Sequence, residues 1–271
     1  MADTLENDKI HREVRNRYAD IARNSGSCCA SSNCCSAGTP GKADASSRLG
    51  YSEDDLATVP DGANMGLGCG NPQAIAALKP GETVLDLGSG GGFDCFLAAR
   101  QVGNTGHVIG VDMTPEMISK ARINAARNGY GNVEFRLGEI EHLPVADASV
   151  DVILSNCVIN LSPDKLQVYR EAFRVLYPGG RLAISDVVAV LPLPPEVTNS
   201  IEAHCGCLAG AAAVSELKHI LSSIGFTDVE IRVKEESRDL IRDWFPGSGV
   251  EEYVRSADVS ARKAASSPCC S

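Results

Sequence analysis

The feature that most constrains the fold is a glycine-rich turn that follows a short apolar run. Residues 84–87 read Val-Leu-Asp-Leu, and Gly88, Gly90 and Gly92 then alternate with other residues before a helical pattern begins at Phe93. A strand, turn and helix of this kind opens the doubly wound α/β sheets that bind a nucleotide at their carboxyl edge. Glycine suits the turn, because without a Cβ atom it tolerates positive φ and close approach to a ligand. The sequence therefore predicts an α/β fold with a nucleotide site.

Strand-like and helix-like segments alternate through the middle of the chain, as in a mostly parallel sheet covered by helices. The expected strands are residues 83–87, 107–111, 133–137, 150–155, 181–186 and 229–233. The expected helices are residues 10–23, 93–101, 115–128, 163–176 and 214–224.

Three regions are expected from this pattern. Residues 1–55 form an N-terminal helix and a flexible, cysteine-rich arm at about 25–47. Residues 56–235 form the doubly wound, mostly parallel core domain. Residues 236–271 form a small helical segment and, beyond about Arg255, a disordered polar tail.

The spacing of the glycines narrows the range of possible ligands. A dinucleotide-binding turn has glycine at the sixth position counted from Gly88, where this chain has Phe93. Asp112, at the end of the next strand, stands where an acid binds ribose hydroxyls. The motif, with Asp86 two residues ahead of the first glycine, resembles that of class I S-adenosylmethionine-dependent methyltransferases. The resemblance implies a Rossmann-like class I methyltransferase fold and S-adenosyl-L-methionine as cofactor.

The same resemblance implies which residues hold that cofactor. The ribose is assigned to Asp112, the adenine to Ile140 with Glu141 or Glu139, and the methionine end to Asn156. The full expected set is Asp86, Gly88, Gly90, Asp112, Met113, Ile140, Glu141 and Asn156.

Composition excludes several other classes of function. A net charge of −10 argues against a nucleic-acid partner, since phosphate binding needs clustered lysine and arginine. No apolar run reaches the length of a membrane span, and the N-terminus lacks the pattern of a signal peptide. We therefore expect a cytoplasmic protein without a membrane partner; we also expect a monomer, which these features do not decide. Eleven cysteines in such a chain should be reduced thiols, which favours a ligand-binding or redox role.

The cysteines differ in where they fall. Cys69 lies in a glycine-rich loop before the first strand of the core, Cys157 at the end of the fourth, and Cys207 after the fifth. Segments that leave the carboxyl ends of parallel strands line the ligand crevice, so these thiols could meet there. A buried cysteine is more often a small hydrophobe, and we favour that interpretation for Cys95, inside a helical pattern.

The segments at residues 65–72, 84–96, 155–165 and 207–211 resemble those of arsenite S-adenosylmethionine methyltransferases, above all Ser-Asn-Cys-Val-Ile-Asn-Leu at 155–161. The resemblance implies that Cys69, Cys157 and Cys207 bind trivalent arsenic as the substrate. It also implies that an N-terminal cysteine takes part in thiol–disulfide chemistry. The candidates are Cys28, Cys29, Cys34 and Cys35, of which Cys34 or Cys35 is favoured.

Arsenic chemistry agrees with this assignment. Trivalent arsenic is thiophilic, and three thiolates leave it a lone pair that can attack the sulfonium methyl group without a general base. Methyl transfer oxidises arsenic formally, so two electrons must return from thiols. A cysteine disulfide that thioredoxin or glutathione reduces would supply them by thiol exchange.

Three other interpretations stay open at this stage. The chain could methylate a carbon or oxygen atom of a small organic acceptor such as a quinone or sterol, although no catalytic base is evident. It could also bind a metalloid without catalysis, although such a protein would not need the cofactor motif. His204, Cys205 and Cys207 could contribute to a zinc site, but the paired CxxC spacing of structural zinc is absent.

Overall fold

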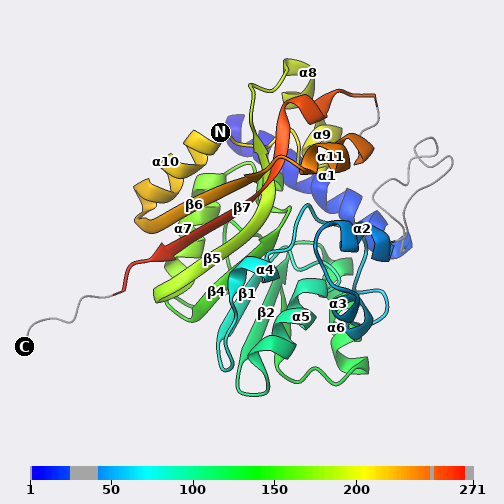
Figure 1. Cartoon of the computed structure of the whole chain (residues 1–271), viewed down its shortest axis with the longest axis vertical. Coiled ribbons are helices and arrows are strands. Elements are labelled where there is room, and N and C mark those ends of the chain that lie inside the picture. The colour runs from blue at the N-terminus through cyan, green and yellow to red at the C-terminus, as the bar shows by residue number, and fades with distance from the viewer. Residues whose placement is uncertain (1, 25–41, 245–246, 266–271) are drawn as a thin grey trace, which may run out of the picture.

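A seven-stranded sheet forms the centre of the protein (Figure 1). The computed structural model describes residues 2–24, 42–244 and 247–265. The strands are β1 Thr83–Leu87, β2 His107–Asp112, β3 Val133–Leu137, β4 Val150–Asn156, β5 Leu176–Ala189, β6 Phe226–Lys234 and β7 Val254–Lys263. Their order is β3-β2-β1-β4-β5-β7-β6. The first five pair in parallel, whereas β7 is antiparallel to β5 and β6, as in the predicted class I methyltransferase fold.

Helices cover both faces of the sheet and its carboxyl edge (Figure 1). The helices packed on the sheet are α4 Gln73–Ala76, α5 Phe93–Val102 and α6 Pro115–Arg127 on one face, with α7 Lys165–Val175 and α10 Val214–Ile224 on the other. Helix α1, Ala2–Asn24, contacts α6 and α9, Ile201–Cys205, and lies beside the loops that leave the strand ends. The remaining helical segments are α2 Lys42–Arg48, α3 Glu53–Thr58, η1 Ile159–Leu161, α8 Pro195–Thr198, α11 Ser237–Trp244 and η2 Val250–Glu252.

The central strands are apolar on both faces, because each face is covered by helices. In β1, Val84 belongs to a core with Phe96 of α5, and the next residue, Leu85, belongs to a core with Val168 of α7. All four side chains are fully buried. Such two-sided burial explains why these strands read as continuous apolar runs rather than as alternating ones.

The predicted strands and helices of the core are all present, with shifts at their ends. The largest shift is in β5, which begins at Leu176 instead of residue 181. The N-terminal helix is longer than expected. The predicted arm at 25–47 needs a correction, since residues 42–48 form α2. The paired cysteines of the arm and the pair Cys269 and Cys270 lie outside the described residues.

The predicted disordered tail is wrong for residues 254–263, which form strand β7. This strand lies between β5 and β6, and Val254, Ala257 and Val259 in it are fully buried. The C-terminal region is therefore not only helical, because β7 is an integral strand of the sheet.

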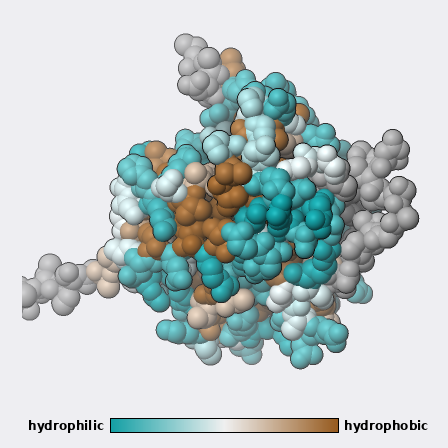
Figure 2. All heavy atoms as spheres, turned by 45° about the horizontal axis from the view of Figure 1, so that its top comes forward, coloured by the Kyte–Doolittle hydropathy of each residue, from teal (hydrophilic) through white to brown (hydrophobic). Residues whose placement is uncertain are grey.

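Figure 2 shows the molecule with the top of Figure 1 turned toward the viewer. The surface in this view is mostly hydrophilic, with one apolar area near its middle. Large exposed hydrophobic side chains include Val190 and Leu191 after β5, and Ile201 at the start of α9. Among the described residues, no helix has the length and apolar character to cross a membrane.

Val259→Ala tests the structural role of β7. Val259 is 0% exposed and pairs with Ile184 of β5 and Ile231 of β6. We expect the substitution to lower the free energy of unfolding by about 2 kcal/mol, because it removes buried methyl groups and leaves a cavity. Urea unfolding followed by circular dichroism measures the change. The exposed neighbour Arg262→Ala should alter it by less than about 0.5 kcal/mol; equal losses in the two variants would contradict the buried placement of Val259.

Candidate active site

Three predicted cysteines meet at the carboxyl edge of β4 and β5. Cys157 follows β4, and its sulfur atom lies within 4.8 Å of that of Cys69. The Cys207 thiol also donates to the carbonyl oxygen of Cys157 at 2.8 Å. Cys95 lies elsewhere, inside α5, where its thiol donates to Asp86 at 3.2 Å. The structure thus brings together the three cysteines that the sequence grouped, and leaves Cys95 apart.

The backbone places two of these thiols in an uncommon way. Cys157 has a φ of 58° and Cys207 a φ of 63°, in the left-handed region that non-glycine residues rarely adopt. Residues in this region concentrate at functional sites, where surrounding contacts hold them.

Burial keeps these thiols protonated at neutral pH. It raises the pKa of the Cys69 thiol to about 11. The hydrogen bond with Cys157, and then burial, raise the pKa of Cys207. At Cys157 the contact with Cys207 favours the thiolate, but the contact with Cys69 and burial outweigh it, so its pKa also rises. The cluster is therefore nearly neutral before it binds anything.

Asp186, which the sequence analysis missed, lies beside the thiols. Its carboxylate and the sulfur atoms of Cys69 and Cys157 all lie within 4.8 Å of one another. Burial raises the pKa of Asp186 to about 6. The carboxylate accepts hydrogen bonds from the backbone of Val187 at 2.8 Å and the side chain of Asn160 at 2.9 Å. A signal existed, because Asp186 ends a predicted strand just as Asp112 does.

A cavity of about 490 Å³ lies next to this cluster. Cys157 and Cys207 line it, whereas Cys69 lies behind them and is only 2% exposed. All the predicted cofactor-binding residues also line it, namely Asp86, Gly88, Gly90, Asp112, Met113, Ile140, Glu141 and Asn156. The two sets of residues that the sequence suggested therefore share one cavity, and their contacts with a ligand stay a prediction.

The walls of the cavity suit a cation. Burial raises the pKa of Asp86 and Asp94, and their mutual repulsion adds to the rise at Asp86. Burial also raises the pKa of Asp112, whose carboxylate accepts the N–H of Gly90 at 3.0 Å. A positively charged ligand would relieve this repulsion. Ser89 also lines this cavity, and its buried hydroxyl has no hydrogen-bond partner in the described structure.

Helix α1 closes one side of the cavity, which the sequence did not indicate. His11 contacts the Glu141 carboxylate at 2.9 Å, and the Ser162 hydroxyl donates to the same carboxylate. Burial works against the charge of Glu141, but these hydrogen bonds hold its pKa below the usual range. The hydrogen bond to Glu141 in turn raises the pKa of His11. Glu139 does not line the cavity; it pairs with Arg15 of α1.

The remaining histidine and cysteine residues singled out in the sequence lie as follows. His204 donates from Nε2 to the carbonyl oxygen of Leu161 at 2.9 Å. Among the described residues, the group that could hold a metal ion is Cys69, Cys157 and Asp186, and it contains neither His204 nor Cys207, which does not favour a zinc site there. Cys205 is buried and lines the cavity near Cys207. Cys34 and Cys35 lie outside the described residues.

Known proteins resemble this chain in sequence and structure. A family described as a methyltransferase domain matches residues 78–225. An arsenite methyltransferase of Halobacterium salinarum is 57% identical over 260 residues, covering 93% of this chain and 66% of that protein. One of Aquipseudomonas alcaligenes is 43% identical, covering 81% of this chain and 62% of that protein. The crystal structure of an arsenic(III) S-adenosylmethionine methyltransferase from Chlamydomonas reinhardtii matches with a TM-score of 0.59 and 33% identity, covering 84% of this chain and 74% of that one.

The fold and the family match define a methyltransferase-domain protein. Within that class, the chain belongs to the arsenite methyltransferase family, as its relatives and the Chlamydomonas structure show. It spans less than two thirds of the length of the two curated relatives.

The raised thiol pKa of Cys157 predicts an unusual pH dependence of its alkylation. Only the thiolate reacts with iodoacetamide, so the rate at Cys157 should still rise above about pH 9, whereas an ordinary thiol levels off near its pKa of about 8.5. Mass spectrometry of the Cys157 peptide after timed quenching measures this rate. The same peptide in urea is the control. A plateau at the same pH in the folded and the unfolded protein would contradict the raised pKa.

Proposed function

We propose that this protein binds S-adenosyl-L-methionine and methylates trivalent arsenic held by Cys69, Cys157 and Cys207, forming mono- and dimethylated arsenicals. The observation that carries the proposal is the meeting of three thiols beside a cavity walled by the glycine turn and Asp112. Detoxification of arsenic would be the biological consequence.

The residues of the cavity fit the proposed cofactor. The turn at Gly88 to Gly92 keeps the backbone open to a ligand, with Gly90 in the left-handed region at a φ of 51°. Asp112 would bind the ribose hydroxyls, Ile140 and Glu141 would meet the adenine, and the acids at Asp86 and Asp94 would stabilise the cationic methionine end. The cofactor supplies an electrophilic methyl group when bound.

The thiol cluster fits arsenic as a substrate. Each neutral thiol can replace a hydroxyl group of arsenous acid, forming an arsenic–sulfur bond while its proton leaves in water. Three such exchanges place no net charge in the buried site, which agrees with the raised thiol pKa values. Bound arsenic keeps a lone pair and carries no proton there. The chain therefore needs to position the metalloid and has no need of a general base.

Reduced thiols complete the proposal. Methyl transfer formally oxidises arsenic by two electrons. Two cysteines return these electrons to arsenic when they form a disulfide. Cys34 or Cys35 is the proposed N-terminal partner, and thioredoxin or glutathione the proposed reductant of the disulfide. The need for reduced cysteines suits a cytoplasmic location.

The alternative of an organic methyl acceptor has less support. An acceptor carbon or oxygen would need a base to remove its proton, whereas the part of the cavity wall next to Cys157 presents protonated thiols. A metalloid binder without catalysis would have no use for the glycine turn and Asp112 beside the thiols.

Cys157→Ser should abolish arsenic methylation and leave cofactor binding unchanged, because the thiol at the centre of the cluster is lost. Separation of arsenic species by chromatography with elemental mass detection, after incubation with arsenite, S-adenosylmethionine and a thiol, measures the activity. Cys95→Ser, which keeps a donor toward Asp86, is the control and should retain activity. Normal turnover by the Cys157 variant would refute the proposed arsenic site.

Asp112→Ala should weaken the cofactor and spare arsenite. It removes the acceptor of the Gly90 N–H and the proposed ribose ligand, so the dissociation constant of S-adenosylhomocysteine should rise at least about tenfold. Isothermal titration calorimetry gives this constant, and arsenite binding to the same variant is the control. An unchanged constant would show that Asp112 does not bind the ribose.

A further inference from the structure

Cys69 lies in a loop whose backbone has wide conformational freedom. It stands between Gly68, which has a φ of 127°, and Gly70. Glycine residues lose more conformational freedom on ordering than other residues do, so such a loop does not hold a side chain in place by itself. The position of the Cys69 thiol therefore depends on what the loop contacts.

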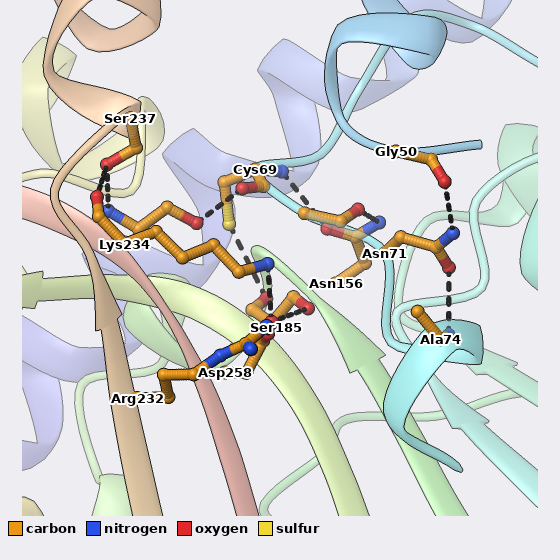
Figure 3. Close-up of polar contacts among 12 residues, drawn as sticks. Gly50, Cys69, Asn71, Ala74, Asn156, Ser185, Arg232, Lys234, Ser237 and Asp258 are labelled. Atoms are coloured by element: carbon orange, nitrogen blue, oxygen red, sulfur yellow. Dashed lines mark hydrogen bonds and ion pairs between the residues drawn. The ribbon is translucent and has the colours of Figure 1, made fainter. Parts of the chain in front are cut away.

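Three polar contacts hold Cys69 (Figure 3). Its N–H donates to the side-chain oxygen of Asn156 at 3.0 Å. Its thiol donates to the carbonyl oxygen of Ser185 at 3.4 Å, and its own carbonyl oxygen accepts the hydroxyl of Ser256 at 2.5 Å. The Ser185 carbonyl also accepts the N–H of Cys157 at 2.8 Å. One carbonyl group of β5 thus accepts hydrogen bonds from two of the three cysteines.

The residues behind these contacts form one row across four strands. Asn156 pairs with Ser185, Ser185 with Asp258, and Asp258 with Arg232 in the register of the sheet. The Asp258 carboxylate accepts the Ser185 hydroxyl at 3.0 Å. It also forms ion pairs with Lys234 at 2.6 Å and with Arg232 at 3.0 Å (Figure 3). Asp258 is buried, so these partners fix it and it in turn fixes Ser185.

The loop packs directly on this row. A Cβ atom added at Gly70 would stand 2.7 Å from the Cβ of Ser185 and 3.4 Å from the ammonium group of Lys234. This approach is closer than any side chain at Gly70 would allow. Cys157 and Cys207 are also linked to each other, by the hydrogen bond from the Cys207 thiol to the Cys157 carbonyl. Cys69 is the one of these three cysteines whose carbonyl accepts a hydrogen bond from β7, through Ser256.

We infer that two residues of β7 are positioning residues that bring Cys69 to Cys157 as the third arsenic ligand: Ser256, through its hydrogen bond to the Cys69 carbonyl, and Asp258, through Ser185. The inference rests on the proposed function. Without these contacts the Cys69 loop shifts, and arsenic is bound by Cys157 and Cys207 only. The antiparallel strand β7 thereby determines whether the site offers three thiolates or two.

Two arsenicals separate this role from a general loss of structure. Arsenite can exchange three oxygen ligands for thiolates, whereas phenylarsine oxide, with one arsenic–carbon bond, exchanges only two. A site that has lost Cys69 therefore loses affinity for arsenite selectively. A site damaged as a whole loses affinity for both compounds.

The experiment compares Ser256→Ala and Asp258→Asn with the wild-type protein at a fixed concentration of competing thiol. We expect the affinity for arsenite to fall about tenfold in both variants, as expected when one cysteine ligand loses its hydrogen bonds. The affinity for phenylarsine oxide should change by less than about twofold. X-ray absorption on samples freed of the competing thiol should count three sulfur neighbours of arsenic in the wild type and two in the variants. Ser256→Thr, which keeps the hydroxyl, should restore three.

The matched control is Glu235→Gln, which removes the 3.0 Å ion pair between Glu235, the residue after β6, and Arg255 of β7, but touches no contact of Cys69. It should bind both arsenicals as the wild type does. Unchanged arsenite affinity with three sulfur neighbours in the Ser256 and Asp258 variants would overturn the inference. An equal loss of both arsenicals, with a lower melting temperature, would overturn it as well. Failure of the wild type and the control to bind arsenite would instead refute the proposed function on which it rests.

Discussion

The carboxyl end of β4 is the point on which both parts of the site depend. Asn156 lines the cavity, and its amide group donates to the carbonyl of Gly70 at 2.8 Å while its oxygen accepts the N–H of Cys69. The next residue, Cys157, stands at the centre of the thiol cluster. Because the two residues are adjacent in the chain, the proposed cofactor site and the proposed arsenic site share one anchor in a buried strand. Neither site can shift far without moving the other.

Charge differs between the two parts of the cavity. Asp86 lies in β1, Asp94 in α5 and Asp112 at the end of β2, and burial raises the pKa of each. Such a cluster favours a cation. The thiols at β4 and β5 have raised pKa values as well, which keeps them neutral and suits exchange with uncharged arsenous acid. The fold thus places a wall of buried carboxylates and a wall of neutral thiols in one cavity, as the proposed sulfonium donor and metalloid acceptor require.

Much of this arrangement could be predicted from the sequence, and the exceptions have physical reasons. The core strands and the glycine turn were evident, because two-sided burial gives long apolar runs. Strand β7 was missed because Arg255, Ser256 and Asp258 suggested a polar tail. They are buried through hydrogen bonds and ion pairs with other segments, which a single sequence does not reveal. Only small or branched residues such as Ala257 and Val259 alternate with the polar ones there, which is a weak strand signal.

The left-handed backbone of Cys157 and Cys207 shows how much of the structure serves the thiol cluster. Each such residue costs about 1–2 kcal/mol relative to the right-handed region. Both persist because neighbours fix them: the Cys157 N–H donates to Ser185, and the Cys207 N–H donates to the carbonyl of His204 at 2.9 Å. In both places the chain turns sharply just after a strand or helix, which directs the thiols toward each other. Glycine would relieve the strain, but it would remove the sulfur. The strain is thus retained at two positions where glycine would relieve it and where the proposed arsenic site has a thiol.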